Sequence, residues 1–203
     1  MPDRRFWLFC AAGASLTVWW ILPWWLPSLL ASLRRGEPAS QVIAVAAGDF
    51  RRTQSGVALW HLRPRALLAL MAPEGADQAM HTHGLRGVAL LPDERRRLHW
   101  IRTCGDSVTE MADLTRWLKG LPGPGSVTVV TSPEHLGRLQ AIATVMAGDS
   151  GWRVEGFASA SAEYKPESEL RLLRDHLRAQ LWRATGWTGR DSLICPARAR
   201  DLF

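Results

Sequence analysis

The sequence lacks charged residues over one long stretch, residues 6–33 (FWLFCAAGASLTVWWILPWWLPSLLASL). Averaged over its 203 residues, the chain is 47% hydrophobic and 22% charged, with a formal net charge of +6. Of the 44 charged side chains, 41 lie among the 170 residues from Arg34 onward, close to the ~25% of a typical soluble domain. This distribution excludes a disordered chain and a multi-span transporter. It predicts one uncharged segment followed by one soluble domain.

Cysteine is scarce, and several catalytic motifs are missing. Cys10, Cys104 and Cys195 show neither a CxxC nor a Cys/His metal spacing, which excludes a disulfide scaffold. Cys104 and Cys195 could pair if the domain faced an oxidising compartment. His81 and His83 have no carboxylate or cysteine at motif spacing, so we expect no metal site. The sequence also lacks G-x-S-x-G, G-x-x-x-x-G-K-[ST] and H-E-x-x-H motifs.

Lysine is nearly absent, and the basic charge comes from arginine. Lys119 and Lys165 are the two lysines, and from Arg34 onward 23 basic residues stand against 18 acidic ones. The planar guanidinium group suits phosphate and carboxylate. Anionic lipid headgroups and phosphorylated small molecules are therefore candidate partners, and a solvated basic surface is the alternative. Nucleic acid is disfavoured because the soluble loops lack aromatic residues interleaved with arginines.

The uncharged segment predicts a single N-terminal transmembrane helix, within an anchor of residues 1–35. Phe6 to Leu22 supplies seventeen residues of a predominantly apolar span. Pro23 then kinks or ends the helix, near a cluster of tryptophans suited to the membrane interface. A cleaved signal peptide and a buried or interfacial helix remain alternatives. Two arginines flank each side of the segment, so the positive-inside rule does not decide its orientation.

Residues 36–203 predict one α/β domain, because apolar runs alternate with helical patterns. Near-continuous apolar strands indicate a mostly parallel sheet of about five strands with helices on both faces. The expected strands are Gln41–Ala47, Ala66–Ala72, Gly87–Leu91, Leu98–Thr103, Ser126–Thr131 and Trp152–Ala158, with a charged loop at Pro92–Arg97. The expected helices are Thr53–Leu62, Ala76–Leu85, Asp106–Lys119, Pro133–Met146 and Pro166–Thr185.

Polar segments follow the predicted strands at the edge where ligands bind in open α/β sheets. They are Gly48–Thr53, Asp106–Thr109 and Thr131–Arg138. His135 and Arg138 are three residues apart and share a helix face. A helix N-terminus with an arginine and a histidine would make an anion site. The alternative is structural, with Asp106 and Ser132 as helix N-caps and Arg138 as a surface charge.

These segments resemble, in order, motifs of the SanA/YdcF/ElyC-type envelope proteins. Val129–Arg138 (VVTSPEHLGR) is similar to the family's VTS-x-x-H-x-x-R-A signature, and Asp106–Glu110 (DSVTE) resembles its D-T-x-T-N helix start. Ala47–Thr53 resembles the glycine-plus-arginine element after the first strand. Leu173–Arg183 stands where the family has a helix with an arginine and an acidic residue. The resemblance covers about residues 41–186.

The resemblance implies a Rossmann-like three-layer domain on a membrane anchor, with a role in cell-envelope biogenesis. It implies the cytoplasmic (inner) membrane as the location, with the domain on the outer (periplasmic) face. We expect the site to bind a phosphorylated or nucleotide-like ligand, either a small molecule or a lipid-linked intermediate. His135 and Asp106 could exchange a proton there. The expected ligand-binding residues are Gly48, Arg52, Thr109, Thr131, Ser132 and Arg138, with main-chain N–H groups of residues 132–135 holding the anion.

The chain departs from the family pattern at three places. Ala46-Ala47-Gly48 stands where the family has Leu-Gly-Gly or similar, and Ala72-Pro73-Glu74-Gly75 replaces Ser-Gly-Gly. Proline removes an N–H and Glu74 adds a negative charge, both unfavourable for phosphate. Glu110 replaces an asparagine. The alternative function is therefore a non-enzymatic envelope interaction module with a degenerate ligand site.

Overall fold

The computed structural model describes residues 40–73, 75–160 and 167–189. The predicted anchor, residues 1–35, lies outside these residues, and so does Glu74. None of the helices in the described ranges has the length and apolar composition needed to cross a membrane.

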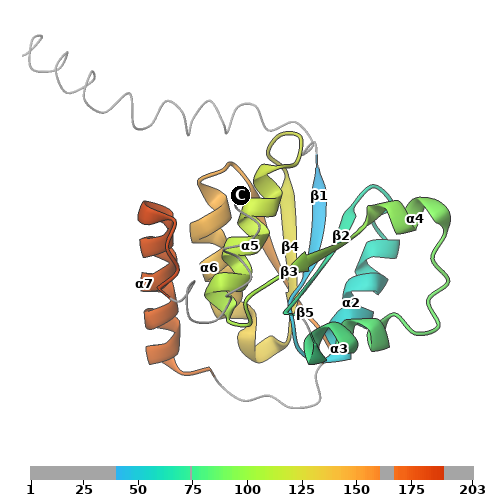
Figure 1. Cartoon of the computed structure of the whole chain (residues 1–203), viewed down its shortest axis with the longest axis horizontal. Coiled ribbons are helices and arrows are strands. Elements are labelled where there is room, and N and C mark those ends of the chain that lie inside the picture. Colours follow the sequence, from blue (N-terminus) through green and yellow to red (C-terminus); the bar gives the residue numbers. More distant parts are fainter. Residues whose placement is uncertain (1–39, 74, 161–166, 190–203) are drawn as a thin grey trace, which may run out of the picture. The chain divides into compact units, whose positions relative to one another are not determined.

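The domain is built on a five-stranded, all-parallel sheet in the order β3-β2-β1-β4-β5 (Figure 1). This is a Rossmann-like α/β arrangement, and it confirms the predicted parallel sheet. The central strand β1 pairs with β2 on one side and with β4 on the other. The strands are β1 (Gln41–Val45), β2 (Leu67–Ala72), β3 (Leu98–Arg102), β4 (Ser126–Thr131) and β5 (Arg153–Ala158).

Helices cover both faces of the sheet, so the domain has three layers (Figure 1). Alternate residues of a strand point to opposite faces. Val42 and Ala44 of β1 therefore join a core with α5, α6 and α7, whereas Ile43 and Val45 pack with α2. The helices are α2 (Phe50–His61), α3 (Ala76–Gly84), α4 (Pro92–Arg97), α5 (Ser107–Lys119), α6 (Pro133–Gly148) and α7 (Glu169–Thr185).

Two predictions between α3 and β3 are wrong. Gly87–Leu91 is not a strand and does not belong to the five paired strands of the sheet. Val88 and Leu90 instead pack, partly buried, against the core beneath α2. Pro92–Arg97 is a short helix rather than a loop, with a proline in its first turn and acids before arginines, which suits the helix dipole.

The strand order fixes where the polar segments meet. After β1, the chain forms β2 and β3 on one side of β1, and then β4 and β5 on its other side. The crevice outside the carboxyl ends of β1 and β4 is thus a topological switch point, where open α/β sheets bind their ligands.

Candidate functional site

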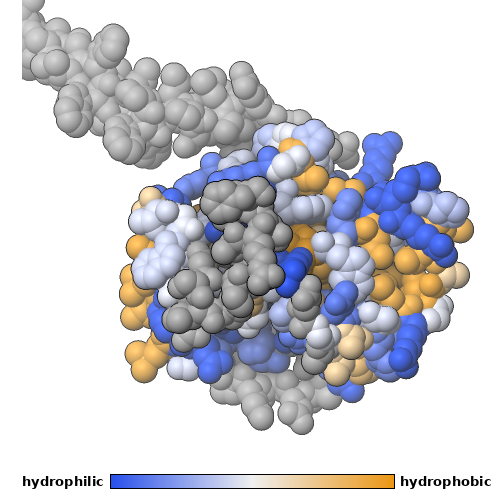
Figure 2. All heavy atoms as spheres, viewed as in Figure 1, coloured by the Kyte–Doolittle hydropathy of each residue, from blue (hydrophilic) through white to orange (hydrophobic). Residues whose placement is uncertain are grey.

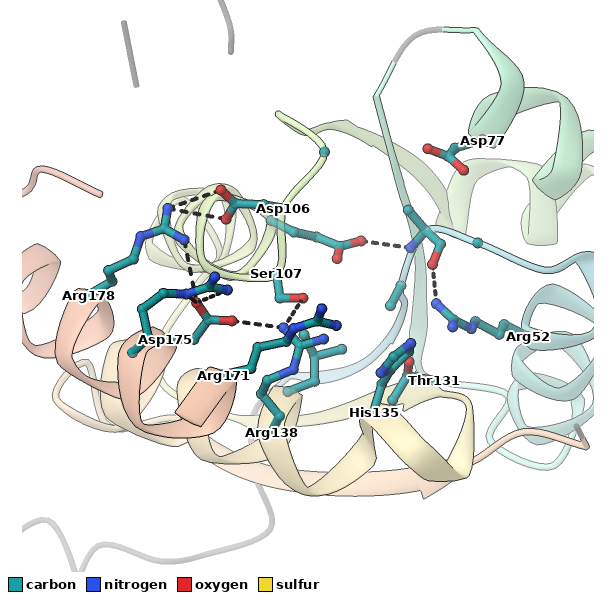
Figure 3. Close-up of a pocket in the computed structure, with 17 residues that line it drawn as sticks. Arg52, Asp77, Asp106, Ser107, Thr131, His135, Arg138, Arg171, Asp175 and Arg178 are labelled. Carbon is teal, nitrogen blue, oxygen red and sulfur yellow. Dashed lines mark hydrogen bonds and ion pairs between the residues drawn. The ribbon is translucent and has the colours of Figure 1, made fainter. Parts of the chain in front are cut away.

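A cavity of about 440 Å³ opens at this switch point (Figure 3). It is lined by the segment after β1, the beginnings of α5 and α6, and α7. Of the eight predicted site residues, six line it: Gly48, Arg52, Asp106, Thr131, His135 and Arg138. Thr109 and Ser132 do not line the cavity and instead hold the residues that do.

The turn after β1 positions Arg52. Asp49 caps α2 by accepting a hydrogen bond from the Arg51 N–H. Arg52 then donates to the Ala47 carbonyl and, at 2.8 Å, to the Ser132 hydroxyl. Gly48 has a φ of 129°, and a Cβ atom there would lie 2.6 Å from the Arg52 guanidinium group. The positive φ therefore favours glycine at this turn.

Glu110 is a buried carboxyl group on the cavity wall, 6% exposed. Its Oε1 accepts a 2.7 Å hydrogen bond from the Ala47 N–H. Burial raises the pKa of Glu110 to about 7, against the opposing effects of the Ala47 N–H and the positive charge of Arg52. The sequence pattern identified Glu110 only as a departure from the family motif, since burial cannot be read from spacing.

Asp106 is the N-cap of α5, as the structural alternative expected. It accepts hydrogen bonds of 3.0 Å from the Val108 and Thr109 N–H groups. The Thr109 hydroxyl oxygen accepts a hydrogen bond from the Asp106 main-chain N–H, which completes a capping box. Arg178 of α7 contacts the same carboxylate at 3.0 Å. Burial opposes ionisation of Asp106, but these hydrogen bonds and Arg178 together lower its pKa.

Arg138 is buried among acidic groups and is not a surface charge. Its Nη1 lies 2.9 Å from both Ser107 Oγ and Asp175 Oδ2. Its Nε forms a 3.0 Å ion pair with Glu167 that is not aligned as a hydrogen bond. Asp175, 2% exposed, also contacts Arg174 at 2.8 Å and Arg178 at 3.6 Å. A buried carboxylate thus holds three arginines at the cavity wall.

The start of α6 differs from the predicted anion cradle. Pro133 has no N–H, and the His135 N–H donates to the Ser132 carbonyl at 3.0 Å. The main-chain donors expected to hold an anion are therefore partly used within the helix. The His135 ring pairs through Nδ1 with Glu167 at 2.7 Å, whereas Asp106 pairs with Arg178. The two residues expected to exchange a proton thus have separate partners.

The cavity lining is rich in charge of both signs. Ionic contacts occupy much of it, yet arginine has five N–H donors, more than these contacts use. Arg171 is the most weakly tied, with side-chain exposure of 54% and a 3.4 Å contact to Glu167. Five arginines stand against four carboxyl groups: Arg52, Arg138, Arg171, Arg174 and Arg178 against Asp77, Asp106, Glu110 and Asp175.

The sequence places Arg171, Arg174 and Arg178 along one helix face, but it does not show that this face lines the site. Nor does it identify Asp175 as a cavity residue. The i, i+3, i+7 spacing of three arginines beside an acidic residue is the signal that could have found this group.

His81 has a structural role. It is 1% exposed, with Nδ1 placed 2.7 Å from the Thr53 hydroxyl and Nε2 placed 2.8 Å from the Met71 carbonyl. Burial lowers its pKa. Both ring nitrogens are thus used in the core, and the part of the chain that the structure describes contains no group of three or more metal-ligating side chains.

Comparison of the chain with protein-family models, with curated proteins and with solved structures gives no match. The resemblance to the SanA/YdcF/ElyC-type proteins therefore stays a prediction, carried by the motifs quoted above.

Proposed function

We propose that this chain is a membrane-anchored, Rossmann-like protein that binds a phosphorylated or nucleotide-like ligand in cell-envelope biogenesis. The observation that carries the proposal is the arginine-lined cavity at the switch point of the sheet. Guanidinium groups from three separate elements converge there, which suits a group with several anionic oxygens. The resemblance to SanA/YdcF/ElyC-type proteins supports the envelope role and the outer (periplasmic) face of the cytoplasmic membrane.

A buried hydroxyl group adds to this support. Thr131 stands at the carboxyl end of β4, is 1% exposed and lines the cavity. Among the described residues, its Oγ1 has no hydrogen-bond partner. Buried polar groups in proteins nearly always have one, so an unpaired hydroxyl at a cavity wall suits a ligand oxygen.

In this proposal, the cavity binds its ligand with two kinds of arginine: those held in place by ion pairs and those that can reorient. Arg138 is held by Asp175 and Ser107, so it contributes its charge and little movement. Arg171 is exposed and weakly tied, so it can turn toward a bound phosphoryl group, which belongs to a small molecule or to a lipid-linked intermediate. Asp106 is held ionised by its partners, which leaves Glu110 as the better proton-exchanging group in the cavity.

One observation favours the second candidate, a non-enzymatic interaction module with a degenerate site. Three of the five cavity arginines share Asp175, and Arg178 also contacts Asp106. Carboxylates of the protein itself thus occupy positions that a phosphate oxygen could take. In this candidate the ionic cluster stabilises the fold, and the cavity holds no phosphorylated or nucleotide-like ligand.

The test compares two arginines of the same helix. Arg171 lines the cavity, whereas Arg183 does not and pairs with Asp149. We expect inorganic pyrophosphate to raise the melting temperature of the purified full chain, relative to chloride at the same ionic strength. R171A should remove most of this shift, because an available cavity cation is lost, and R183A should retain it.

Two results would reject ligand binding at this cavity. One is the absence of a pyrophosphate shift in the unaltered chain, together with full complementation of a deletion strain by R171A. The other is an equal loss of the shift in R171A and R183A, which would indicate nonspecific charge screening. The first of these results would favour the interaction module.

A further inference from the structure

Helix α7 carries an apolar stripe that points away from the domain. Leu170, Leu173, Leu177 and Leu181 are spaced three, four and four residues apart, so they lie along one helix face. They are 78%, 57%, 59% and 37% exposed. Figure 2 shows hydrophobic side chains along the edge of the molecule where Figure 1 places α7. We call these four residues the leucine stripe.

The opposite face of α7 is the one that packs. Asp175, Ala179 and Trp182 are buried, and Ala179 and Trp182 belong to the core with α5 and α6. The leucine stripe therefore needs no contact within the described domain. Single exposed leucines are common in soluble proteins, but four along one helix form a continuous apolar surface.

The rest of α7 is basic. The helix contains four arginines and two acidic residues. Arg174 and Arg171, with side-chain exposures of 57% and 54%, flank the stripe and line the cavity, whereas Arg178 on the same flank is 16% exposed and paired with Asp106. Trp187, 52% exposed, follows the end of the helix. Leucines on one face, arginines beside them and a tryptophan at the end are features of helices that lie on anionic membranes.

We propose that the leucine stripe of α7 docks on the surface of an anionic lipid bilayer, with its arginines at the level of the phosphate headgroups. The proposal rests on the membrane anchoring included in the proposed function, but not on ligand binding in the cavity. Charge complementarity favours this occupant: leucines enter the headgroup–acyl boundary while the flanking guanidinium groups contact lipid phosphates.

A second copy of the chain fits the stripe less well. A specific stable protein interface buries roughly 800 Å² on each partner, whereas the stripe spans ~17 Å of one helix. In an antiparallel pair of α7 helices, the same flank of each copy would face its equivalent. The arginine flanks, with Arg171, Arg174 and Arg178, would then meet. A bilayer needs no matching protein surface and supplies the opposite charge.

Docking would bring the cavity to the membrane surface. Arg171, Arg174 and Arg178 line the cavity from the helix that carries the leucine stripe. The anionic group that the cavity binds would then be taken from, or handed to, the headgroup layer. This consequence concerns access to the site and requires no change in the site itself.

The test uses the full chain in vesicles with a photo-crosslinking phenylalanine analogue, p-benzoylphenylalanine, at single positions. Leu177, in the stripe, is compared with Leu62, which is 80% exposed at the end of α2. In vesicles containing phosphatidylglycerol, irradiation should yield lipid adducts at least about threefold more often at position 177 than at position 62. Phosphatidylcholine alone should reduce the adducts at position 177.

The outcomes separate docking from anchoring and from ligand binding. Equal lipid adducts at the two positions, or covalent dimers through position 177, would overturn the docking proposal. Flotation of the chain with vesicles reports anchoring, and the pyrophosphate shift in the same preparation reports the cavity. Flotation and a normal shift without lipid adducts at position 177 would therefore reject docking alone. Unchanged melting temperatures of both variants serve as the folding control.

Discussion

The carboxylate of Asp175 organises the cavity more than any residue that the sequence pattern singled out. It is 2% exposed and contacts Arg138, Arg174 and Arg178. Taking a carboxylate out of water is costly unless cations surround it, so the aspartate and the arginines depend on one another. The cavity wall is therefore an ionic cluster whose members stabilise one another. Arg138 is thus a poor choice for a binding test, and the exposed Arg171 is a better one.

A pH prediction concerns Glu110. Its ordinary pKa of 4.5 is raised to about 7 by burial, so the folded protein favours the protonated form. The stabilisation is fully present below pH 4.5 and is lost as the pH rises through 7, a change of ~3 kcal/mol. E110Q keeps the shape and the acceptor for the Ala47 N–H. We expect it to lose this part of the pH dependence.

The measurement is the free energy of unfolding of the purified chain, from urea denaturation at several values between pH 4.5 and 8. The difference between the unaltered chain and E110Q isolates the titration of Glu110 from that of other groups. Parallel curves across this range would contradict the prediction, because they would mean that Glu110 has a similar pKa in the folded and unfolded states.

At the scale of single elements, Asp106 at the start of α5 both caps the helix and forms an ion pair. Asp106 accepts from two main-chain N–H groups and pairs with Arg178 of α7. D106A removes both roles, whereas D106N removes the charge but keeps a cap acceptor. We expect D106A to be less stable than D106N by ~1 kcal/mol, the usual value of an N-cap. Urea midpoints of the two variants give this difference directly, and equal midpoints would contradict it.

Local sequence signals predicted most elements because they coincide with physical boundaries. Ser126–Thr131 is a β-branched run between a glycine-rich turn and a proline, and β4 has these bounds. Ser132-Pro133-Glu134 marks a helix start, and α6 begins at Pro133. Gly87–Leu91 has similar apolar character, yet it lies outside the sheet, and Val88 and Leu90 pack against the core instead. Pairing partners are a property of the sheet and cannot be read from one segment.

The candidate site was predictable where it follows from strand ends and less so where it depends on α7. Gly48, Arg52, Thr131 and Arg138 follow strands or lie in the next turn, so parallel topology brings them together. The role of Asp175 depends on how α7 packs against α5 and α6, which its own sequence does not determine. Glu110 and Asp106 both carry carboxyl groups that burial makes harder to ionise. Their pKa values nevertheless shift in opposite directions, because hydrogen bonds and Arg178 favour the charged form of Asp106.

At the scale of the whole molecule, the compartment of the domain can be tested through cysteine. Cys104 is 4% exposed, and the other two cysteines lie outside the described residues. Disulfides persist in oxidising compartments. If the domain faces the periplasm, we expect peptides containing Cys104 and Cys195 to be joined in protein isolated with its thiols blocked. Free thiols at both positions, detected by alkylation and mass spectrometry, would instead indicate a reducing compartment.

The position of α7 in the chain has a consequence for biogenesis. The five strands of the sheet and Arg52 and Arg138 precede it in the sequence, whereas three of the five cavity arginines and their buried carboxylate Asp175 belong to it. All five strands are synthesised before α7, so the lining of the cavity is incomplete until α7 has been made. The ionic cluster around Asp175 is therefore completed only after all five strands have been synthesised.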